Sequence, residues 1–248
     1  RCRKFDISWN RYKDGGSSCA MRLKPTPSIF ATKLTKKVSK ISKELRYKLI
    51  ETKDVDFDAF IVLGNGDVDD NVIPIFCHHL NGIAVVGITK PEGKTRISVL
   101  TDFPTYISKL KISKIVLVMD QEDDRIDTIY EQIERNLRNL NIRFSLAEDE
   151  SRIRRYSCSL GSKIFDFILI ISGLDDIPAD KHRIEDHLVK AAVDIGKIDP
   201  PNEKIDTKVT WKTLSESQKS EILNKLKESK SFSRKIFPQH FKGLGLLK

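Results

Sequence analysis

The sequence predicts an α/β fold in which a mainly parallel sheet is flanked by helices and carries an added antiparallel strand section. Apolar strand-like runs alternate with amphipathic helical segments from residue 57 to 141, a pattern typical of βαβ units. The run 115–119, Ile-Val-Leu-Val-Met, is typical of a strand buried on both faces of a parallel sheet. Gly161-Ser162 separates the strand-like segments 152–160 and 163–172, which predicts an antiparallel hairpin.

The chain is long enough for one α/β domain with an extension at each end. It has 248 residues, of which 39% are hydrophobic, and this suffices for a single sizeable core. We expect four parts, which are a flexible lead-in (1–31), a basic amphipathic helix (32–56), the α/β domain (57–198) and a basic helical tail (199–248).

Charge is distributed unevenly along the chain. Residues 1–56 hold 15 Lys and Arg against 6 Asp and Glu, and residues 203–248 hold 11 against 5. Residues 57–202 are acidic instead, with 18 basic residues against 24 acidic ones. An acidic centre suits a bound cation and basic flanks suit a polyanion. A surface that is merely soluble and rich in lysine is the alternative.

Several features bear on the location of the protein. No apolar run approaches the roughly 18–20 residues that cross a bilayer, so we expect no membrane segment. The first twenty residues are polar and basic and the four cysteines are scattered, which predicts no secretory signal and a cytoplasmic location. Because the chain begins at Arg1, we expect a fragment or a processed product, with Met21 as an alternative start. A homo-oligomer is compatible with the sequence.

The first half of the chain is assigned from hydrophobic periodicity. Leu34, Val38, Ile41 and Leu45 recur at helical spacing among lysines, which predicts an amphipathic basic helix. Asp67 or Asp69 is expected to cap the helix that ends near Leu80. The expected elements in this half are a helix at 32–50, a strand at 57–63, a helix to 80, a strand at 83–88, a partly helical segment to 110, and a strand at 115–119.

The second half begins with a helix and then changes character. Residues 124–141 predict an amphipathic helix, and three strands and another helix are expected to follow it. The tail ends in Phe232, Ile236, Phe237 and Phe241, which we expect to dock on the body of the domain. The expected elements are a helix at 124–141, strands at 144–146, 152–160 and 163–172, a helix at 182–192 and a helical tail at 213–241.

The central strand ends abruptly in a cluster of carboxylates. Asp120, Glu122, Asp123 and Asp124 lie within five residues of one another. Open α/β sheets bind ligands at the carboxyl ends of their strands, and oxygen ligands suit Mg²⁺. The cluster therefore predicts a site for Mg²⁺, or for Mn²⁺. The alternative is a solvated turn in which Asp123 or Asp124 caps the next helix.

The order of these parts resembles the Toprim domain that topoisomerases, primases, OLD-type nucleases and ribosomal RNA maturases share. The resemblance rests on Leu63-Gly64-Asn65-Gly66-Asp67 after the first strand and on Asp120-Gln121-Glu122-Asp123-Asp124 after the third. A later Ile184-Glu185-Asp186-His187-Leu188 completes it. The chain looks closest to the small stand-alone Toprim-like proteins of archaea and bacteria, over roughly residues 57–195.

The resemblance implies a Mg²⁺-dependent, nuclease-type phosphodiester site on a nucleic acid, either DNA or RNA. The metal would be held by Asp120, Glu122 and Asp124, and Glu185 and Asp186 would be a second metal site or a structural pair. Where the family has a glutamate at the end of the first strand, this chain has Leu63, so the site is partly degenerate. Loss of such a general acid typically costs about a hundred- to ten-thousand-fold in rate.

Two further groups of residues complete this prediction. Carboxylates at the start of the next helix would replace the missing glutamate, and basic residues near the site would contact phosphates. The replacements are Asp67, Asp69 and Asp70. The phosphate contacts are Lys94, Arg96, Arg125, Arg154 and Arg155.

Two alternatives remain open. The segment Gly93-Lys94-Thr95 follows a strand and predicts a P-loop-like nucleotide binder. However, five residues rather than four separate Gly87 from Gly93, and Pro91 removes a donor from the loop. The second alternative is a non-catalytic module that binds a nucleic acid or a protein.

Cys77-His78-His79 is expected to be part of a half-buried helix and not a metal site, since adjacent helical residues diverge.

Overall fold

The sheet is the organising element of the computed structural model, which describes residues 22–25, 31–45, 57–64, 68–80 and 84–247. Seven strands within these ranges form one sheet in the order β1-β3-β2-β4-β7-β6-β5. The first five strands in this order are parallel, and β6 and β5 are antiparallel additions. The predicted α/β class with an antiparallel section is therefore confirmed. The strands are β1 (Arg22–Pro25), β2 (Ala59–Leu63), β3 (Val85–Thr89), β4 (Lys114–Asp120), β5 (Arg143–Glu150), β6 (Ile153–Leu160) and β7 (Lys163–Ser172).

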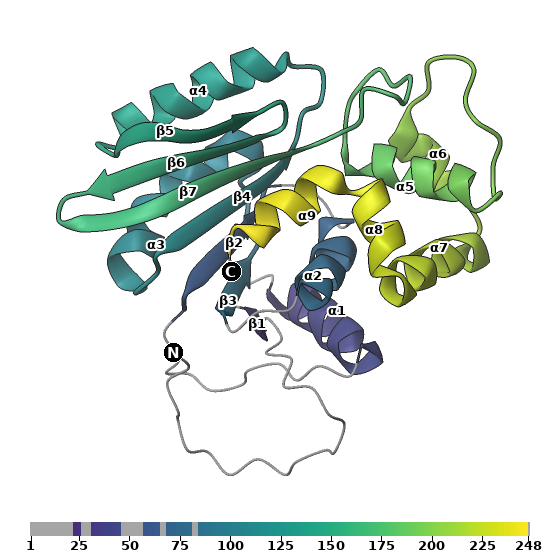
Figure 1. Cartoon of the computed structure of the whole chain (residues 1–248), viewed down its shortest axis with the longest axis horizontal. Coiled ribbons are helices and arrows are strands. Elements are labelled where there is room, and N and C mark those ends of the chain that lie inside the picture. The colour runs from purple at the N-terminus through teal and green to yellow at the C-terminus, as the bar shows by residue number, and fades with distance from the viewer. Residues whose placement is uncertain (1–21, 26–30, 46–56, 65–67, 81–83, 248) are drawn as a thin grey trace, which may run out of the picture.

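Helices cover both faces of the sheet (Figure 1). One buried apolar cluster joins α1, α2, α5 and the C-terminal helices to alternate residues of the strands. A second cluster joins η1, α3 and α4 to the residues that face the other way. The helical elements are α1 (Ala31–Glu44), α2 (Asp69–His79), η1 (Arg96–Asp102), α3 (Phe103–Lys109), α4 (Ile126–Asn139), α5 (Ile184–Asp194), α6 (Thr207–Thr213), α7 (Glu216–Glu228), α8 (Lys230–Ile236) and α9 (Pro238–Gly245).

Strand β4 lies at the centre of the sheet because its residues are apolar on both sides. Its successive side chains alternate between the two clusters, with Leu117 in the second and Val118 in the first, and both are fully buried. Parallel pairing puts Leu63 of β2 opposite Val118, and Asp120 opposite Ser172 of β7. The carboxyl ends of β2, β4 and β7 therefore meet at one edge of the sheet.

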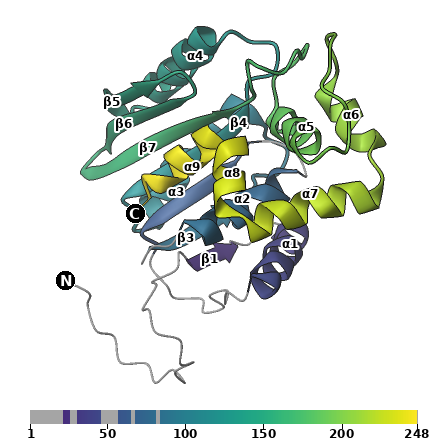
Figure 2. The same ribbon diagram turned by 45° about the vertical axis from the view of Figure 1, so that its right-hand side comes forward.

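The basic helices at both ends of the chain pack on the α/β body. In α1, Leu34, Val38 and Ile41 are buried in the first cluster, while the lysines of the opposite side are mostly exposed. Helix α9 packs against β7 and α2, and Phe237 and Phe241 at its start both contact an aromatic ring of α2. The tail aromatics thus dock as expected. Figure 2 shows α5 beside the end of β4, with α6 beyond it.

Some local expectations were wrong. Arg125, not Asp123 or Asp124, occupies the N-cap position of α4. Val68 occupies that position in α2, so Asp69 is the first helical residue and does not cap the helix. The strand expected at 144–146 extends over Arg143–Glu150, because it pairs along most of β6 despite its polar sequence. Pairing in an added hairpin needs backbone groups and not apolar side chains.

Candidate functional site

A pocket of about 660 Å³ lies where the carboxyl ends of the central strands meet the start of α5 and the C-terminal helices. This volume is in the usual range of small-molecule sites. Its lining combines apolar surface with charged side chains of both signs. The acidic lining residues are Asp69, Asp120, Glu122 and Glu185, and the basic ones are Arg96, Arg183, Lys208, Lys212 and Lys219.

Three carboxylates from separate elements form what we call the acidic cluster, namely Asp69, Asp120 and Glu185. Asp120 is the last residue of β4, while Asp69 and Glu185 lie in the first turns of α2 and α5. The fold brings them together because α2 starts beyond the carboxyl end of β2, the parallel neighbour of β4. The charges of Asp120 and Glu185 both act on Asp69.

Asp69 is the most unusual residue of the acidic cluster. Its side chain is buried, and neither carboxylate oxygen has a hydrogen-bond partner among the residues that the structure describes. Burial raises the pKa of Asp69 well above its ordinary value, and repulsion from Asp120 and Glu185 raises it further. Buried polar groups are nearly always hydrogen-bonded, so this carboxylate requires either a proton or a bound cation.

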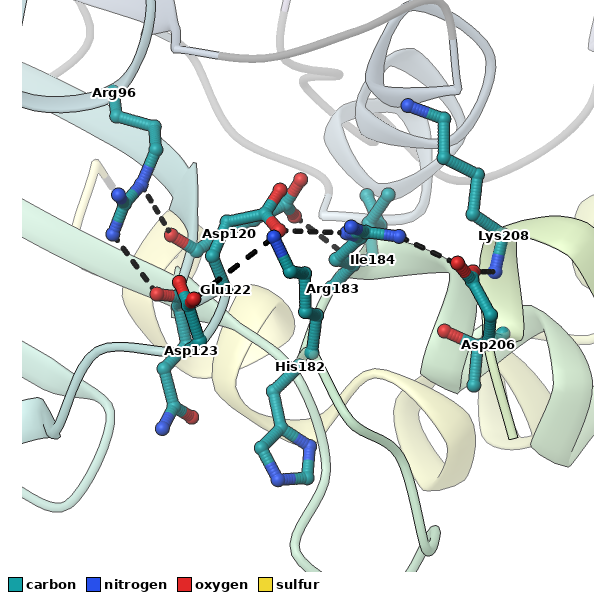
Figure 3. A network of polar contacts seen from close by, with 12 residues as sticks. Arg96, Asp120, Glu122, Asp123, His182, Arg183, Ile184, Asp206 and Lys208 are labelled. Atoms are coloured by element: carbon teal, nitrogen blue, oxygen red, sulfur yellow. Dashed lines mark hydrogen bonds and ion pairs between the residues drawn. The ribbon is translucent and has the colours of Figure 1, made fainter. Parts of the chain in front are cut away.

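Hydrogen bonding orients Asp120 in the pocket. Its Oδ1 accepts a hydrogen bond of 2.9 Å from the backbone amide of Ile184, at the start of α5 (Figure 3). This contact ties the end of β4 to the helix that carries Glu185. Burial is the largest cause of the raised pKa of Glu185, which nearby Lys208 and Arg183 partly oppose.

The turn after β4 has an uncommon backbone conformation. Glu122 has a φ of 59° and Arg96, which contacts this turn, has a φ of 52°. Left-handed values at residues with a Cβ carry a conformational cost and often occur at functional sites. Arg96 donates from Nη2 to the Gln121 carbonyl at 2.9 Å and to Asp124 at 2.6 Å, and from Nε to the Asp120 carbonyl at 3.3 Å. Its guanidinium therefore holds the turn that carries Asp120.

Arg183 links the turn to the C-terminal helices. Its Nε donates to Glu122 at 2.9 Å and its Nη1 to Asp206 at 3.3 Å, so it lies between the two carboxylates (Figure 3). The backbones of Glu122 and His182 also exchange two hydrogen bonds, of 2.8 and 2.9 Å. These contacts fix the position of Glu122 and engage its carboxylate with a cation.

The predicted metal residues do not gather as the sequence indicated. Asp120 and Glu122 both line the pocket, but Glu122 pairs with Arg183, and Asp124, which does not line the pocket, pairs with Arg96. Asp186 is buried away from the cluster, where it accepts hydrogen bonds from the Thr207 hydroxyl and the backbone amide of Leu174. Of the predicted pair at the start of α5, the structure thus brings only Glu185 to the site.

The three residues expected to replace the missing glutamate have different environments. Asp67 lies outside the described residues. Asp69 is in the acidic cluster, whereas Asp70 forms ion pairs with Lys37 and Lys90, at 3.4 and 3.5 Å. Leu63 is fully buried in the apolar core, so nothing at that position can transfer a proton.

Of the predicted phosphate contacts, only Arg96 lines the pocket. Lys94 pairs with Asp102. Arg154 pairs with Asp149 and covers the ring of Tyr130, and Arg155 pairs with Glu148. Arg125 is exposed, and its ion pair with Asp127 is long, at 4.0 Å.

The other expected features are placed as follows. The Gly93-Lys94-Thr95 segment leads into the 3₁₀ helix η1 rather than into the α-helix of a P-loop, which weakens the nucleotide-binding alternative. Cys77 and His78 are buried within α2, and Nε2 of His78 contacts the Ser42 hydroxyl at 2.9 Å. They are therefore part of the packing between α1 and α2.

Sequence reasoning missed the basic side of the pocket. Arg183, Lys208, Lys212 and Lys219 come from α6, α7 and the residue before α5. No local motif distinguishes these lysines from the many others in the tail. The only signal was the excess of positive charge after residue 202.

The acidic cluster fits a cation that is bound through one or two carboxylates, and it does not fit a metal site built from protein ligands alone. Across the described ranges, no group of three or more His, Cys, Asp or Glu residues is arranged to hold a metal ion. Mg²⁺, however, is usually bound through one or two carboxylates together with water and substrate phosphates. The oxygens of Asp69, buried without a hydrogen-bond partner beside the negative charge of Asp120, fit that second type of binding.

Comparisons with known proteins assign no family to this chain. No protein-family model, curated protein or solved structure matches the chain. Within the described part of the chain, no helix combines the length and the apolar composition that crossing a membrane requires.

Proposed function

We propose that the pocket is a Mg²⁺- or Mn²⁺-dependent phosphodiester site of a Toprim-like, nucleic-acid-associated protein. The observation that carries this proposal is the buried Asp69 carboxylate, which has no hydrogen-bond partner in the described part of the chain and is repelled by Asp120 and Glu185. The position of the cluster at the carboxyl end of a parallel sheet supports the proposal, since ligands bind there in such folds. The basic residues that line the same pocket supply charge for a phosphate group.

Each residue has a defined role in this proposal. Asp69 and Asp120 would hold the cation, which would polarise a phosphodiester and stabilise the leaving oxygen. Glu185 adds negative charge at the same place, and its buried carboxyl group can accept or give up a proton. Arg96 and Arg183 are positioning residues, because they fix the turn that follows β4.

A second candidate function is a non-catalytic nucleic-acid-binding or protein-binding module on the same scaffold. Leu63 favours it, because the glutamate expected at that position is replaced by a buried apolar side chain. In this alternative the acidic cluster binds no cation, and the basic residues alone bind the partner. The two candidates therefore differ in the behaviour of Asp69 and Asp120.

Calorimetric titration with Mg²⁺ and with Mn²⁺ tests the proposal. We expect the wild type to bind in the micromolar to millimolar range, and Asp69→Asn and Asp120→Asn each to weaken binding at least tenfold. Asp123→Asn is the matched control, since Asp123 is an exposed carboxylate of the same turn that does not line the pocket. It should bind within twofold of the wild type.

Two outcomes would contradict the proposal. Absence of binding by the wild type at millimolar metal would leave the non-catalytic alternative. Equal losses in Asp123→Asn and Asp120→Asn would show that only the general negative charge of the turn attracts the cation. If the cation binds as expected, hydrolysis of single-stranded and double-stranded DNA and RNA should depend on Asp69 and Asp120.

A further inference from the structure

The acidic and basic side chains of the pocket come largely from different elements. The acidic cluster comes from α2, β4 and α5, whereas Lys208, Lys212 and Lys219 come from α6 and α7. We call Lys208 and Lys212 the lysine pair. A single phosphate held by a cation at the acidic cluster needs no second set of positive charges from separate helices. A ligand with another anionic group would use both sides of the pocket.

The lysine pair differs from the other cations of the pocket. Arg96, Arg183 and Lys219 each have a carboxylate partner. Among the residues that the structure describes, neither member of the lysine pair forms an ion pair, although the charge of Lys208 acts on Glu185 in the same pocket. Two ammonium groups that line a pocket without a carboxylate partner are available to bind an anion.

The helix that carries the lysine pair is fixed in place. Asp206 caps α6 by accepting hydrogen bonds from the amides of Lys208 and Val209, at 2.9 and 3.1 Å, and it also pairs with Arg183. The Thr207 hydroxyl donates a hydrogen bond of 2.7 Å to the buried carboxylate of Asp186 in α5. These contacts tie α6 to α5, the helix that carries Glu185 of the acidic cluster. The lysine pair is therefore held at a fixed position relative to the acidic cluster.

The two lysines also lie on the same side of the helix. Residues four apart are neighbours on a helix surface, and Trp211, between them in sequence, also lines the pocket. Trp211 is only 8% exposed and packs in the apolar core. It therefore supports the lysine pair and does not offer a free face for stacking.

We propose that Lys208 and Lys212 form a subsite for a second phosphate, so that the pocket takes a ligand with at least two phosphate groups. This inference rests on the proposed function for the position of the first phosphate, at the acidic cluster. Lysine ammonium groups recognise phosphate as point charges. The second phosphate belongs to a neighbouring nucleotide of an oligonucleotide or to the polyphosphate of a free nucleotide.

Fluorescence anisotropy with a labelled single-stranded oligonucleotide of about 12 nucleotides, long enough to span one such site, tests the subsite in EDTA, which prevents hydrolysis. We expect the double variant Lys208→Gln/Lys212→Gln to bind at least tenfold more weakly than the wild type at moderate salt. The slope of log affinity against log salt should fall by about 0.7, because the lysine pair neutralises one phosphate and each phosphate neutralised on a single strand contributes about 0.7. The matched control is Lys225→Gln/Lys230→Gln, which removes two exposed lysines of α7 and α8 that do not line the pocket.

The control decides the interpretation. If the control weakens binding as much as the lysine-pair variant does, or if neither variant weakens it, the subsite does not exist.

Competition identifies the source of the phosphates. Displacement of the oligonucleotide by an equal concentration of a nucleoside triphosphate would assign the subsite to a free nucleotide, and absence of displacement would assign it to a nucleic acid. Equally effective displacement by inorganic phosphate would overturn the requirement for two phosphates.

Failure of this inference can be distinguished from failure of the proposed function. Metal titration depends on Asp69 and Asp120, whereas anisotropy in EDTA depends on the lysine pair. If the cation binds and the lysine variants have no effect, the subsite alone is wrong. If the lysine variants weaken binding and no cation binds, the lysine pair is still a phosphate site, whereas the first phosphate at the acidic cluster and the metal-dependent activity are wrong.

Discussion

At the residue scale, two neighbouring aspartates in α2 have opposite environments. Asp69 is buried, has no hydrogen-bond partner within the described ranges and is repelled by Asp120. Asp70 is also buried, but it pairs with Lys37 and Lys90. A protein that keeps an unpaired buried carboxylate loses stability at that position, as sites selected for function often do.

This contrast predicts opposite effects of the same substitution. In EDTA, Asp69→Asn should raise the melting temperature by about 2–4 °C, the shift that corresponds to roughly 1 kcal/mol in a chain of this size, because asparagine avoids the cost of protonating a buried carboxylate that nearby carboxylates repel. Asp70→Asn should lower it by at least as much, because the ion pairs of this buried carboxylate with Lys37 and Lys90 are lost. Thermal unfolding in EDTA measures both.

Added metal extends the test of Asp69. If Asp69 holds a cation, Mg²⁺ should raise the melting temperature of the wild type and not that of Asp69→Asn, since a ligand stabilises the state that binds it. A lower melting temperature for Asp69→Asn in EDTA would show that the carboxylate has a structural partner and would contradict the environment described for it.

The backbone conformation of Arg96 and Glu122 could not be predicted from the sequence. Positive φ values are favoured by glycine, yet both residues have a Cβ, so no local signal marks the turn that they form. Their conformation depends on Arg96 reaching the carbonyl groups of Asp120 and Gln121, which lie 24 and 25 residues further along the chain. Contacts of that range cannot be found from local patterns.

At the element scale, most strands and helices follow from the sequence because their apolar residues recur at the expected spacing. Strand β4 and helices α2 and α4 lie close to their predicted limits. Periodicity also predicted the docking of the tail aromatics, but it could not predict that α6 would supply Lys208 and Lys212 to the pocket. That placement depends on the packing of α6 against α5, which no repeat in the sequence encodes.

The packing of α9 against β7 gives a prediction about this element. A Cβ on Gly243 would lie 2.5 Å from Cγ1 and Cδ1 of the buried Ile170, whereas a Cβ on Gly245 would have no heavy atom of the described residues within 4 Å. Gly243→Ala should therefore lower the free energy of unfolding by about 1–3 kcal/mol through overpacking. Gly245→Ala is the matched control in the same helix and should be neutral or stabilising, since alanine favours helix.

Urea unfolding of both variants measures the difference. If Gly243→Ala and Gly245→Ala change stability equally, α9 does not pack closely on β7. Loss of this close approach would also affect Gln239, whose side-chain amide donates to the Gly173 carbonyl at 2.9 Å. The contact between the tail and the end of β7 therefore depends on a glycine that allows two elements to approach each other.

At the scale of the whole molecule, buried histidines connect the C-terminal helices to the sheet. His240 of α9 is fully buried, and its Nε2 lies 3.0 Å from the hydroxyl of Ser172. Burial is the largest cause of its strongly lowered pKa, and His187 and Arg152 lower the pKa further. In α2, burial is likewise the largest cause of the lowered pKa of His78, which is about 4.

These histidines predict a loss of stability in mild acid. An unfolded histidine takes up a proton near pH 6.5, whereas the folded protein keeps His240 and His78 neutral at that pH. Falling pH therefore favours the unfolded state from about pH 6.5 downward, and the contribution of His78 stops growing near pH 4, where its folded form also becomes protonated. Between pH 7 and 5 each such histidine should lower the free energy of unfolding by roughly 2 kcal/mol.

Comparison with a variant isolates this effect from the carboxylates. Asp69 and Glu185, whose pKa values are raised, act in the opposite direction as the pH falls, but their contributions cancel between the wild type and His240→Gln. Urea unfolding at pH 7, 6 and 5 should show that the free energy of unfolding falls less in the variant than in the wild type. The difference should be about the contribution of one histidine, even if the variant is less stable at pH 7. Parallel declines in the two proteins would show that His240 is protonated in the folded state, and the tail would then not exclude water from the end of β7.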